Sequence, residues 1–94
     1  MWRIEEHRGV DKELSGRDPL DILKRYENWK DIATLSGPPG LRAIKGFRDE
    51  ALTGKWKGYR SSRLNEQWCV IYRVVADALL VQVVRVTPHD YRRA

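Results

Sequence analysis

The chain has 94 residues, of which 41% are hydrophobic and 33% are charged, and it carries a net charge of +5. This length predicts one domain, residues 1–94, and excludes a second catalytic module, while four Trp and four Tyr provide enough apolar surface for a folded core. The single cysteine, Cys69, excludes an internal disulfide, and with only His7 and His89 beside it we expect no metal site and no cofactor.

The sequence also indicates where the protein works. Its longest apolar stretch, residues 78–84, is interrupted by Gln82 and is far shorter than the roughly 20 residues that span a bilayer. Residues 1–6 lack the basic and then apolar pattern of a secretory signal. We therefore expect a cytoplasmic protein without a membrane partner.

The positive charge is distributed unevenly along the chain. Residues 1–50 contain ten Lys or Arg and ten Asp or Glu, whereas residues 51–94 contain eight and three, so the whole excess lies in the second half. A basic surface formed by one half of a small domain suits a polyanion such as RNA. The alternative is a basic surface that serves only solubility.

The first half of the chain predicts one strand and two helical segments. Residues 2–6 alternate apolar with polar side chains, as a half-buried strand does. Asp18 can cap a helix whose first position is Pro19. Apolar residues three or four positions apart predict one buried stripe on this helix: Ile22, Leu23, Tyr26, Trp29, Ile32 and Ala33. Residues 37–40 (GPPG) should end it, and residues 41–47 should form a shorter helical turn.

The second half predicts three strands. Residues 59–64, 68–75 and 79–86 are rich in aromatic and β-branched side chains, and their connections are short enough for hairpins. Residues 79–86 are apolar at nearly every position, which is typical of a central strand covered by helices on one face. The expected fold is α+β: a curved, mostly antiparallel sheet, made of the N-terminal strand and a three-strand meander, with two helices on one face and a basic concave face left open.

Two side chains are candidates for proton transfer. Cleaving RNA without a metal requires a base for the ribose 2′-OH, an acid for the leaving 5′-oxygen and fixed positive charge on the phosphate. His89, just after the last predicted strand, has the pKa range for such an exchange, although a surface histidine in a tail is the alternative. Glu50 directly precedes the basic half and can act as the base, but nearby cations would lower its pKa, and a salt-bridged glutamate is the more common outcome.

Several basic and aromatic residues are candidates for holding RNA. Residues 55–60 (KWKGYR) interleave cations with aromatic rings, a composition that binds phosphates and stacks bases. The alternative is that Trp56 and Tyr59 belong to the core. Arg60 and Arg63, three positions apart in one strand, should point to opposite faces, and we expect Arg63 on the concave one.

The order and spacing of these segments resemble a known family. Residues 50–65 (EALTGKWKGYRSSRLN), 70–74 (VIYRV) and 84–91 (VRVTPHDY) together resemble the RelE/ParE superfamily of toxins from toxin–antitoxin systems, and within it the YoeB/YafQ/HigB-like mRNA interferases. The similarity covers about residues 41–93, while the first half agrees in layout more than in sequence.

The resemblance implies roles for individual residues. Glu50 falls on the glutamate that acts as base, and His89 on the C-terminal histidine that acts as acid. Arg63 falls where members of the family have a functional arginine or histidine, and Tyr91 on a terminal aromatic residue that helps to hold the substrate. These four are the predicted catalytic residues, and the predicted RNA-binding positions are Lys55, Lys57, Arg60 and Cys69.

Cys69 is a departure from the family pattern. The family usually presents an arginine directly before the Val-Ile-Tyr-Arg run, where it steadies the scissile phosphate, and this chain has a neutral thiol there. Losing such a charge typically costs about 10²- to 10³-fold in rate. We therefore expect an attenuated enzyme, or a small buried hydrophobic residue at this position.

The resemblance implies a ribosome-dependent mRNA endoribonuclease that needs no metal, leaves 2′,3′-cyclic phosphate and 5′-OH ends, and is silenced by a cognate antitoxin protein. Two alternatives remain at this stage. One is a catalytically inactive homologue that only binds antitoxin or RNA. The other is a ParE-like gyrase inhibitor, although ParE-like chains generally lack the combination of Glu50 with His89.

Overall fold

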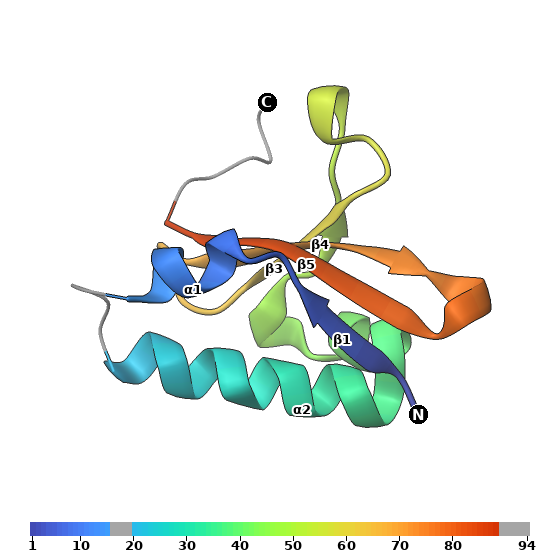
Figure 1. The fold of residues 1–94 in the computed structure, drawn as a ribbon, viewed down its shortest axis with the longest axis horizontal. Helices are drawn as coiled ribbons and strands as arrows, with labels where there is room; N and C mark the ends of the chain where they lie inside the picture. Colours follow the sequence, from blue (N-terminus) through green and yellow to red (C-terminus); the bar gives the residue numbers. More distant parts are fainter. Residues whose placement is uncertain (16–19, 89–94) are drawn as a thin grey trace.

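A five-stranded sheet and a long helix form the two main layers of the fold, in a computed structural model that describes residues 1–15 and 20–88 (Figure 1). The elements in chain order are β1 (Arg3–Glu6), α1 (Gly9–Leu14), α2 (Leu20–Ala43), the 3-10 turn η1 (Lys45–Phe47), β2 (Glu50–Ala51), η2 (Gly54–Trp56), β3 (Arg60–Arg63), β4 (Cys69–Val75), η3 (Ala76–Ala78) and β5 (Leu80–Thr87). The expected α+β class is confirmed.

The strands are arranged in the order β1-β5-β4-β3-β2. The last three strands of the chain, β3, β4 and β5, form the predicted antiparallel meander, and β2 adds an antiparallel edge. β1 pairs with β5 in parallel, with Arg3 opposite Leu80 and Glu6 opposite Val83. The apolar strand β5 is therefore central, as its composition predicted.

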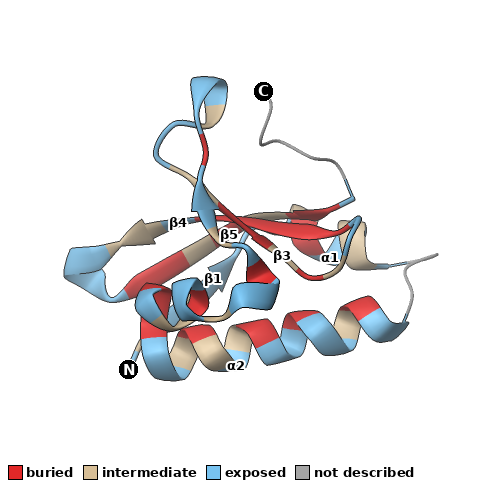
Figure 2. Ribbon diagram, turned by 180° about the vertical axis from the view of Figure 1, so that it is seen from behind, coloured by how far each residue is buried: buried red, intermediate tan, exposed pale blue. Residues whose placement is uncertain are grey.

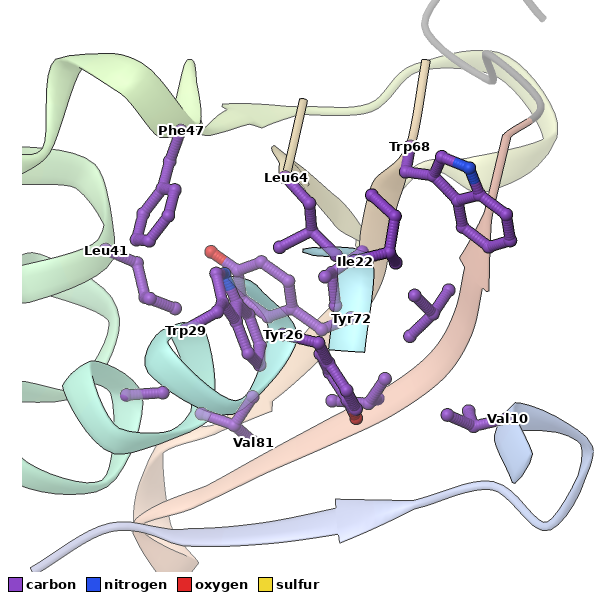
Figure 3. Packing of buried hydrophobic residues seen from close by; sticks show 14 residues of the cluster. Val10, Ile22, Tyr26, Trp29, Leu41, Phe47, Leu64, Trp68, Tyr72 and Val81 are labelled. Carbon is purple, nitrogen blue, oxygen red and sulfur yellow. The ribbon is translucent and has the colours of Figure 1, made fainter. Parts of the chain in front are cut away.

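Helix α2 carries the predicted apolar stripe. Ile22, Tyr26, Trp29 and Ala33 are buried, and they face the sheet across the core (Figures 2 and 3). The predicted start at Asp18 and Pro19 lies outside the described residues. The predicted end is a sharp break at Gly37, whose φ of 67° and ψ of −167° are not helical, after which the chain continues helically to Ala43.

The core between α2 and the sheet is dense with aromatic rings. Trp29 packs edge-on against Tyr72 of β4, with 5.3 Å between ring centroids, and lies 6.1 Å from Tyr26 (Figure 3). The Tyr26 hydroxyl donates a hydrogen bond of 2.6 Å to Glu6, which ties α2 to β1. Burial, together with this carboxylate, raises the pKa of Tyr26 well above its usual value, so the ring stays neutral.

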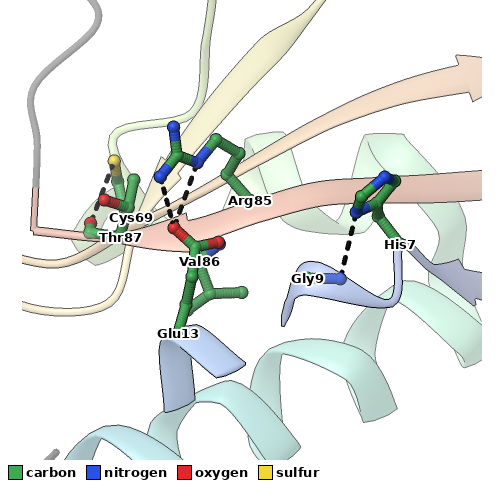
Figure 4. Close-up of polar contacts among 7 residues, drawn as sticks. All are labelled: His7, Gly9, Glu13, Cys69, Arg85, Val86 and Thr87. Carbon is green, nitrogen blue, oxygen red and sulfur yellow. Dashed lines mark hydrogen bonds and ion pairs between the residues drawn. The ribbon is translucent and has the colours of Figure 1, made fainter. Parts of the chain in front are cut away.

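Helix α1 was not anticipated from the sequence. Its Val10 is fully buried, and its Glu13 accepts hydrogen bonds of 2.6 and 3.0 Å from the Arg85 guanidinium and one of 3.1 Å from the Val86 amide (Figure 4). These contacts hold α1 against the last residues of β5, beyond the end of β1. Among residues 1–15 and 20–88, no helix combines the length and apolar character needed to cross a membrane.

Gly37 generates the first prediction. Its positive φ is unfavourable for side chains, and an added Cβ would lie 2.3 Å from Nε1 of Trp2. Replacing Gly37 with Ala should therefore lower the free energy of unfolding by about 2–4 kcal/mol in urea titrations. The control is Gly46→Ala, because a Cβ there meets nothing within 4 Å. Equal stability of the two variants would contradict the strain assigned to Gly37.

Candidate active site

The strand pairing brings predicted site residues together on the face of the sheet that lies away from α2. In an antiparallel pair, residues directly opposite each other point to the same face. Glu50 lies opposite Ser61, and Ser61 opposite Ile71. We call this surface the distal face and define it by the side-chain rows that begin at Glu50 and at Arg63.

Arg63 lies on the distal face, as the alternation of strand β3 predicted. It is opposite Cys69, and Cys69 is opposite Thr87 at the end of β5. Arg63 is two positions from Ser61, the partner of Glu50, and such diagonal neighbours are typically about 7–8 Å apart. The exposed Glu50 and the half-buried Arg63 are thus diagonal neighbours on this face, and the Arg63 Nη1 atom donates a hydrogen bond of 2.9 Å to the carbonyl oxygen of Glu66.

Cys69 lies on the distal face, opposite Arg63. Its side chain is buried, with 4% exposed, beside Leu52 and Ile71. The thiol points toward the carbonyl oxygen of Thr87 at 3.7 Å (Figure 4). Cys69 therefore packs as a small apolar residue.

The predicted basic and aromatic segment projects from the sheet on the side opposite α2 (Figure 1). Lys55 and Lys57 are exposed there. Trp56 and Tyr59 are half-buried, meet edge to face at 5.2 Å, and pack against the cluster that contains Cys69. The distal face is therefore not uniformly basic, because a small apolar cluster lies at its centre.

Arg60 is not brought together with the other predicted site residues. It points to the face toward α2, where its Nε atom donates a hydrogen bond of 2.7 Å to Asp49. Ser62 donates another of 2.5 Å to the same carboxylate, and the Tyr72 hydroxyl donates a third. We call these four residues the Asp49 cluster.

The Asp49 cluster fixes the chain immediately before Glu50. The Asp49 side chain has no solvent exposure, so its charge is balanced only by the donors around it. Burial alone would lower the pKa of the Arg60 guanidinium, but its pairing with Asp49 outweighs burial and raises that pKa. Burial and Asp49 both raise the pKa of Tyr72. Arg60 therefore stays charged and Tyr72 neutral, which are the states that donate to Asp49. Sequence reasoning missed Asp49 because its partners are distant in the sequence.

Arg85 is a second residue that sequence reasoning missed. It is opposite Ile71 and therefore belongs to the distal face, in the same row as Glu50. Its ion pair with Glu13 at 2.6 Å holds it at the side of this face (Figure 4). The alternation of residues 81–86 contains the signal, but a register shift in β5, between the partners of Ile71 and Tyr72, interrupts the simple two-residue count.

Two predicted catalytic residues, His89 and Tyr91, lie outside the described residues. The described chain reaches Pro88, directly after Thr87 at the end of β5. Within the part that the structure describes, no group of three or more His, Cys, Asp or Glu side chains is placed to hold a metal ion.

Solved structures of known proteins share this fold. The archaeal RelE in the RelE–RelB complex of Pyrococcus horikoshii shares the fold with a TM-score of 0.73 and 23% identity, over 93% of each chain. The DinJ–YafQ toxin–antitoxin complex of Escherichia coli contains a chain similar with a TM-score of 0.62 and 23% identity, over 92% of this chain and 90% of that one. The fold is thus RelE-like.

The sequence comparison is more specific. The chain is 32% identical over 76 residues to the mRNA interferase toxin YafQ of Escherichia coli K12, covering 74% of this chain and 82% of YafQ. The search of protein-family models finds no match. On the strength of the likeness to YafQ, the chain belongs to the RelE superfamily of toxins.

The Asp49 cluster generates the second prediction. Asn at position 49 removes the charge opposite Arg60 and places an amide donor among groups that themselves donate. Asp49→Asn should therefore lower the free energy of unfolding by about 2–4 kcal/mol in urea titrations. Asp31→Asn, on the exposed side of α2, is the matched control and should change stability by less than about 0.5 kcal/mol. Equal losses in both variants would contradict the structural role of the cluster.

Proposed function

We propose that this protein is a metal-independent endoribonuclease that cleaves mRNA on the ribosome and is silenced by a cognate antitoxin. The observation that carries this proposal is the placement of Glu50 and Arg63 on one face of the sheet, in neighbouring rows. The likeness to the mRNA interferase YafQ supports the substrate. Such an enzyme would act in the cytoplasm, where ribosomes translate mRNA.

The proposed reaction needs one base, one acid and one cation. Glu50 takes the proton of a ribose 2′-OH, and the resulting oxygen attacks the adjacent phosphorus. Arg63 stabilises the negative charge that builds up on the phosphoryl oxygens. The bond to the 5′-oxygen then breaks, and His89 donates the proton that the leaving oxygen requires. The products are a 2′,3′-cyclic phosphate and a free 5′-OH.

Three further residues have supporting roles in this proposal. Tyr91 holds the substrate beside the acid. Lys55 and Lys57, exposed on the segment that projects from the sheet, attract the RNA backbone. Glu50 is exposed, which suits a group that must reach a ribose hydroxyl.

Structures of complexes that contain similar chains support the proposal of an antitoxin partner. RelE of Pyrococcus horikoshii and YafQ of Escherichia coli were both solved bound to their antitoxins. We propose that an acidic or amphipathic antitoxin segment covers the basic residues of this chain, gaining affinity from charge pairing and from burial of aromatic rings.

We further propose that Cys69 attenuates the enzyme. A neutral thiol beside Arg63 leaves one guanidinium where the family usually has a second positive charge for the phosphate. The buried position of Cys69 also favours a second candidate function, a homologue that binds RNA or antitoxin without cleaving, and the two differ in measurable turnover.

The third prediction tests the proposed base. Translating ribosomes are incubated with the protein, and the new RNA ends are analysed for 2′,3′-cyclic phosphate and 5′-OH. Glu50→Gln should slow single-turnover cleavage by about 10²- to 10⁴-fold, because it removes the proton acceptor. Glu27→Gln makes the same change on the exposed side of α2 and should cleave normally.

Two outcomes of that assay count against the proposal. An unchanged rate in Glu50→Gln would remove Glu50 from the mechanism. Ribosomes need magnesium to stay intact, so the EDTA experiment includes a check that they remain assembled. Loss of cleavage by EDTA under that condition would contradict a reaction without a metal.

The fourth prediction concerns Cys69. In Cys69→Arg the new guanidinium lies opposite Arg63, and a bound phosphate would be held between two cations. Single-turnover cleavage should rise by about one to three powers of ten. Without RNA, two neighbouring cations at a buried position should lower the melting temperature. A large fall in melting temperature with no gain in cleavage would contradict a phosphate site at this position.

A further inference from the structure

A cavity of about 390 Å³ opens beside Arg63, where three arginines from three parts of the chain meet. They are Arg25 of α2, Arg48 of the turn before β2, and Arg63 at the end of β3. The rest of the lining is Gly46, Leu64, Asn65 and Glu66. With three guanidinium groups and one carboxylate, the lining carries a formal charge of +2.

Arg25 keeps a donor available to the cavity. Its Nε atom donates a hydrogen bond of 2.8 Å to the Asp21 carboxylate, and its Nη1 atom donates one of 3.1 Å to the carbonyl oxygen of Leu64. These two bonds fix the guanidinium against the β3–β4 connection. Within residues 1–15 and 20–88, no hydrogen-bond partner is found for its Nη2 atom.

Asn65 supplies a neutral donor whose orientation is also fixed. Its Oδ1 atom accepts a hydrogen bond of 2.8 Å from the backbone N–H of Gln67 and one of 2.7 Å from the backbone N–H of Trp68. The amide nitrogen, Nδ2, therefore remains as the group that can donate to a ligand. Among the residues that the structure describes, it has no partner.

Arg48 lies in the turn that connects this cavity with the candidate active site. Its backbone is left-handed, with φ 44° and ψ 45°, a conformation that is unfavourable for an arginine. The next residue, Asp49, is buried and the one after it is Glu50. The turn thus places an exposed arginine at the cavity and a carboxylate on the distal face only two residues apart.

We propose that this cavity binds one nucleotide of the RNA strand next to the cleavage site, with Arg25 and Arg48 on its phosphate and Asn65 on an acceptor of its base. The inference rests on the proposed function and extends it to a second subsite. Arg63 lines both the cavity and the distal face, so the two sites are continuous. A single strand can then pass from one to the other.

The chemistry of the cavity favours a nucleotide over other ligands. Guanidinium groups bind phosphate oxygens in pairs, and Arg25, although it is paired with Asp21, keeps its Nη2 donor for a ligand anion. The volume is within the range of about 300–1,000 Å³ that small-ligand pockets have, which is more than a single phosphate requires. The amide of Asn65 adds a donor suited to a base edge.

The test uses a short single-stranded RNA whose riboses are 2′-O-methylated, so that the strand binds but lacks the attacking hydroxyl. Its Kd for the full chain is measured by fluorescence anisotropy over a range of salt concentrations. The variants are Arg25→Gln, Arg48→Gln and their combination. Arg42→Gln, an exposed arginine of α2 outside the cavity lining, is the matched control.

Each cavity variant should weaken RNA binding by about fivefold, and the double variant by more than tenfold. The slope of log Kd against log salt concentration should fall by about 0.7 for each phosphate group that a variant no longer binds. Arg42→Gln should leave both quantities near those of the parent chain. Thermal melting of all variants is recorded, and we expect shifts of no more than a few degrees because these arginines are exposed or partly exposed.

Three results would overturn the inference. The first is equal RNA affinity in the double variant, the control and the parent chain. The second is unchanged RNA affinity with weakened binding of the antitoxin, which would make the cavity a protein-binding site. The third is unchanged affinity for the oligonucleotide with weaker binding to vacant ribosomes, which would assign it to ribosomal RNA. Cleavage by the parent chain is measured separately, so failure of the proposed function is visible independently.

Discussion

The arrangement of the distal face depends on one buried carboxylate. Asp49 is shielded from solvent and accepts hydrogen bonds from Arg60, Ser62 and Tyr72, so β3, β4 and the turn before β2 are held at a single point. A buried charge tolerates little displacement, because every donor that moves away leaves it poorly compensated. Glu50 is the next residue in the chain and begins a strand of only two residues, so the position of Glu50 depends on how Asp49 is held.

The sequence predicts those elements whose pattern is long enough to have a period. The stripe on α2 identified the buried helix face, and the alternation in β3 assigned Arg60 and Arg63 to opposite faces of the sheet. The six-residue helix α1 and the two-residue strand β2 are too short for any such pattern. The Asp49 cluster was beyond sequence reasoning for another reason, since its partners lie 11 to 23 positions away.

The candidate site was predicted in part. Alternation in β3 predicted that Arg60 and Arg63 point to opposite faces. It did not predict the pairing of β2 with β3 that brings Glu50 beside Arg63, nor the apolar cluster around Leu52 and Ile71 that occupies the middle of the expected basic face. That cluster forms because the segment before β3 returns over the sheet and packs its aromatic rings there. Whether such a segment folds back is decided by tertiary contacts and not by local composition. His89 and Tyr91 stay predictions.

The pairing of the first strand with the last one ties folding to the order of synthesis. β1 is made at the start and β5 near the end, and contacting residues such as Glu5 and Gln82 are 77 positions apart in the sequence. Strand β5 is thus the last strand to be translated, and its neighbours β1 and β4 cannot pair with it until then. Closing so long a loop is entropically costly and slow. A chain that ends before residues 80–87 therefore lacks the strand that joins β1 to β4 and cannot complete the core.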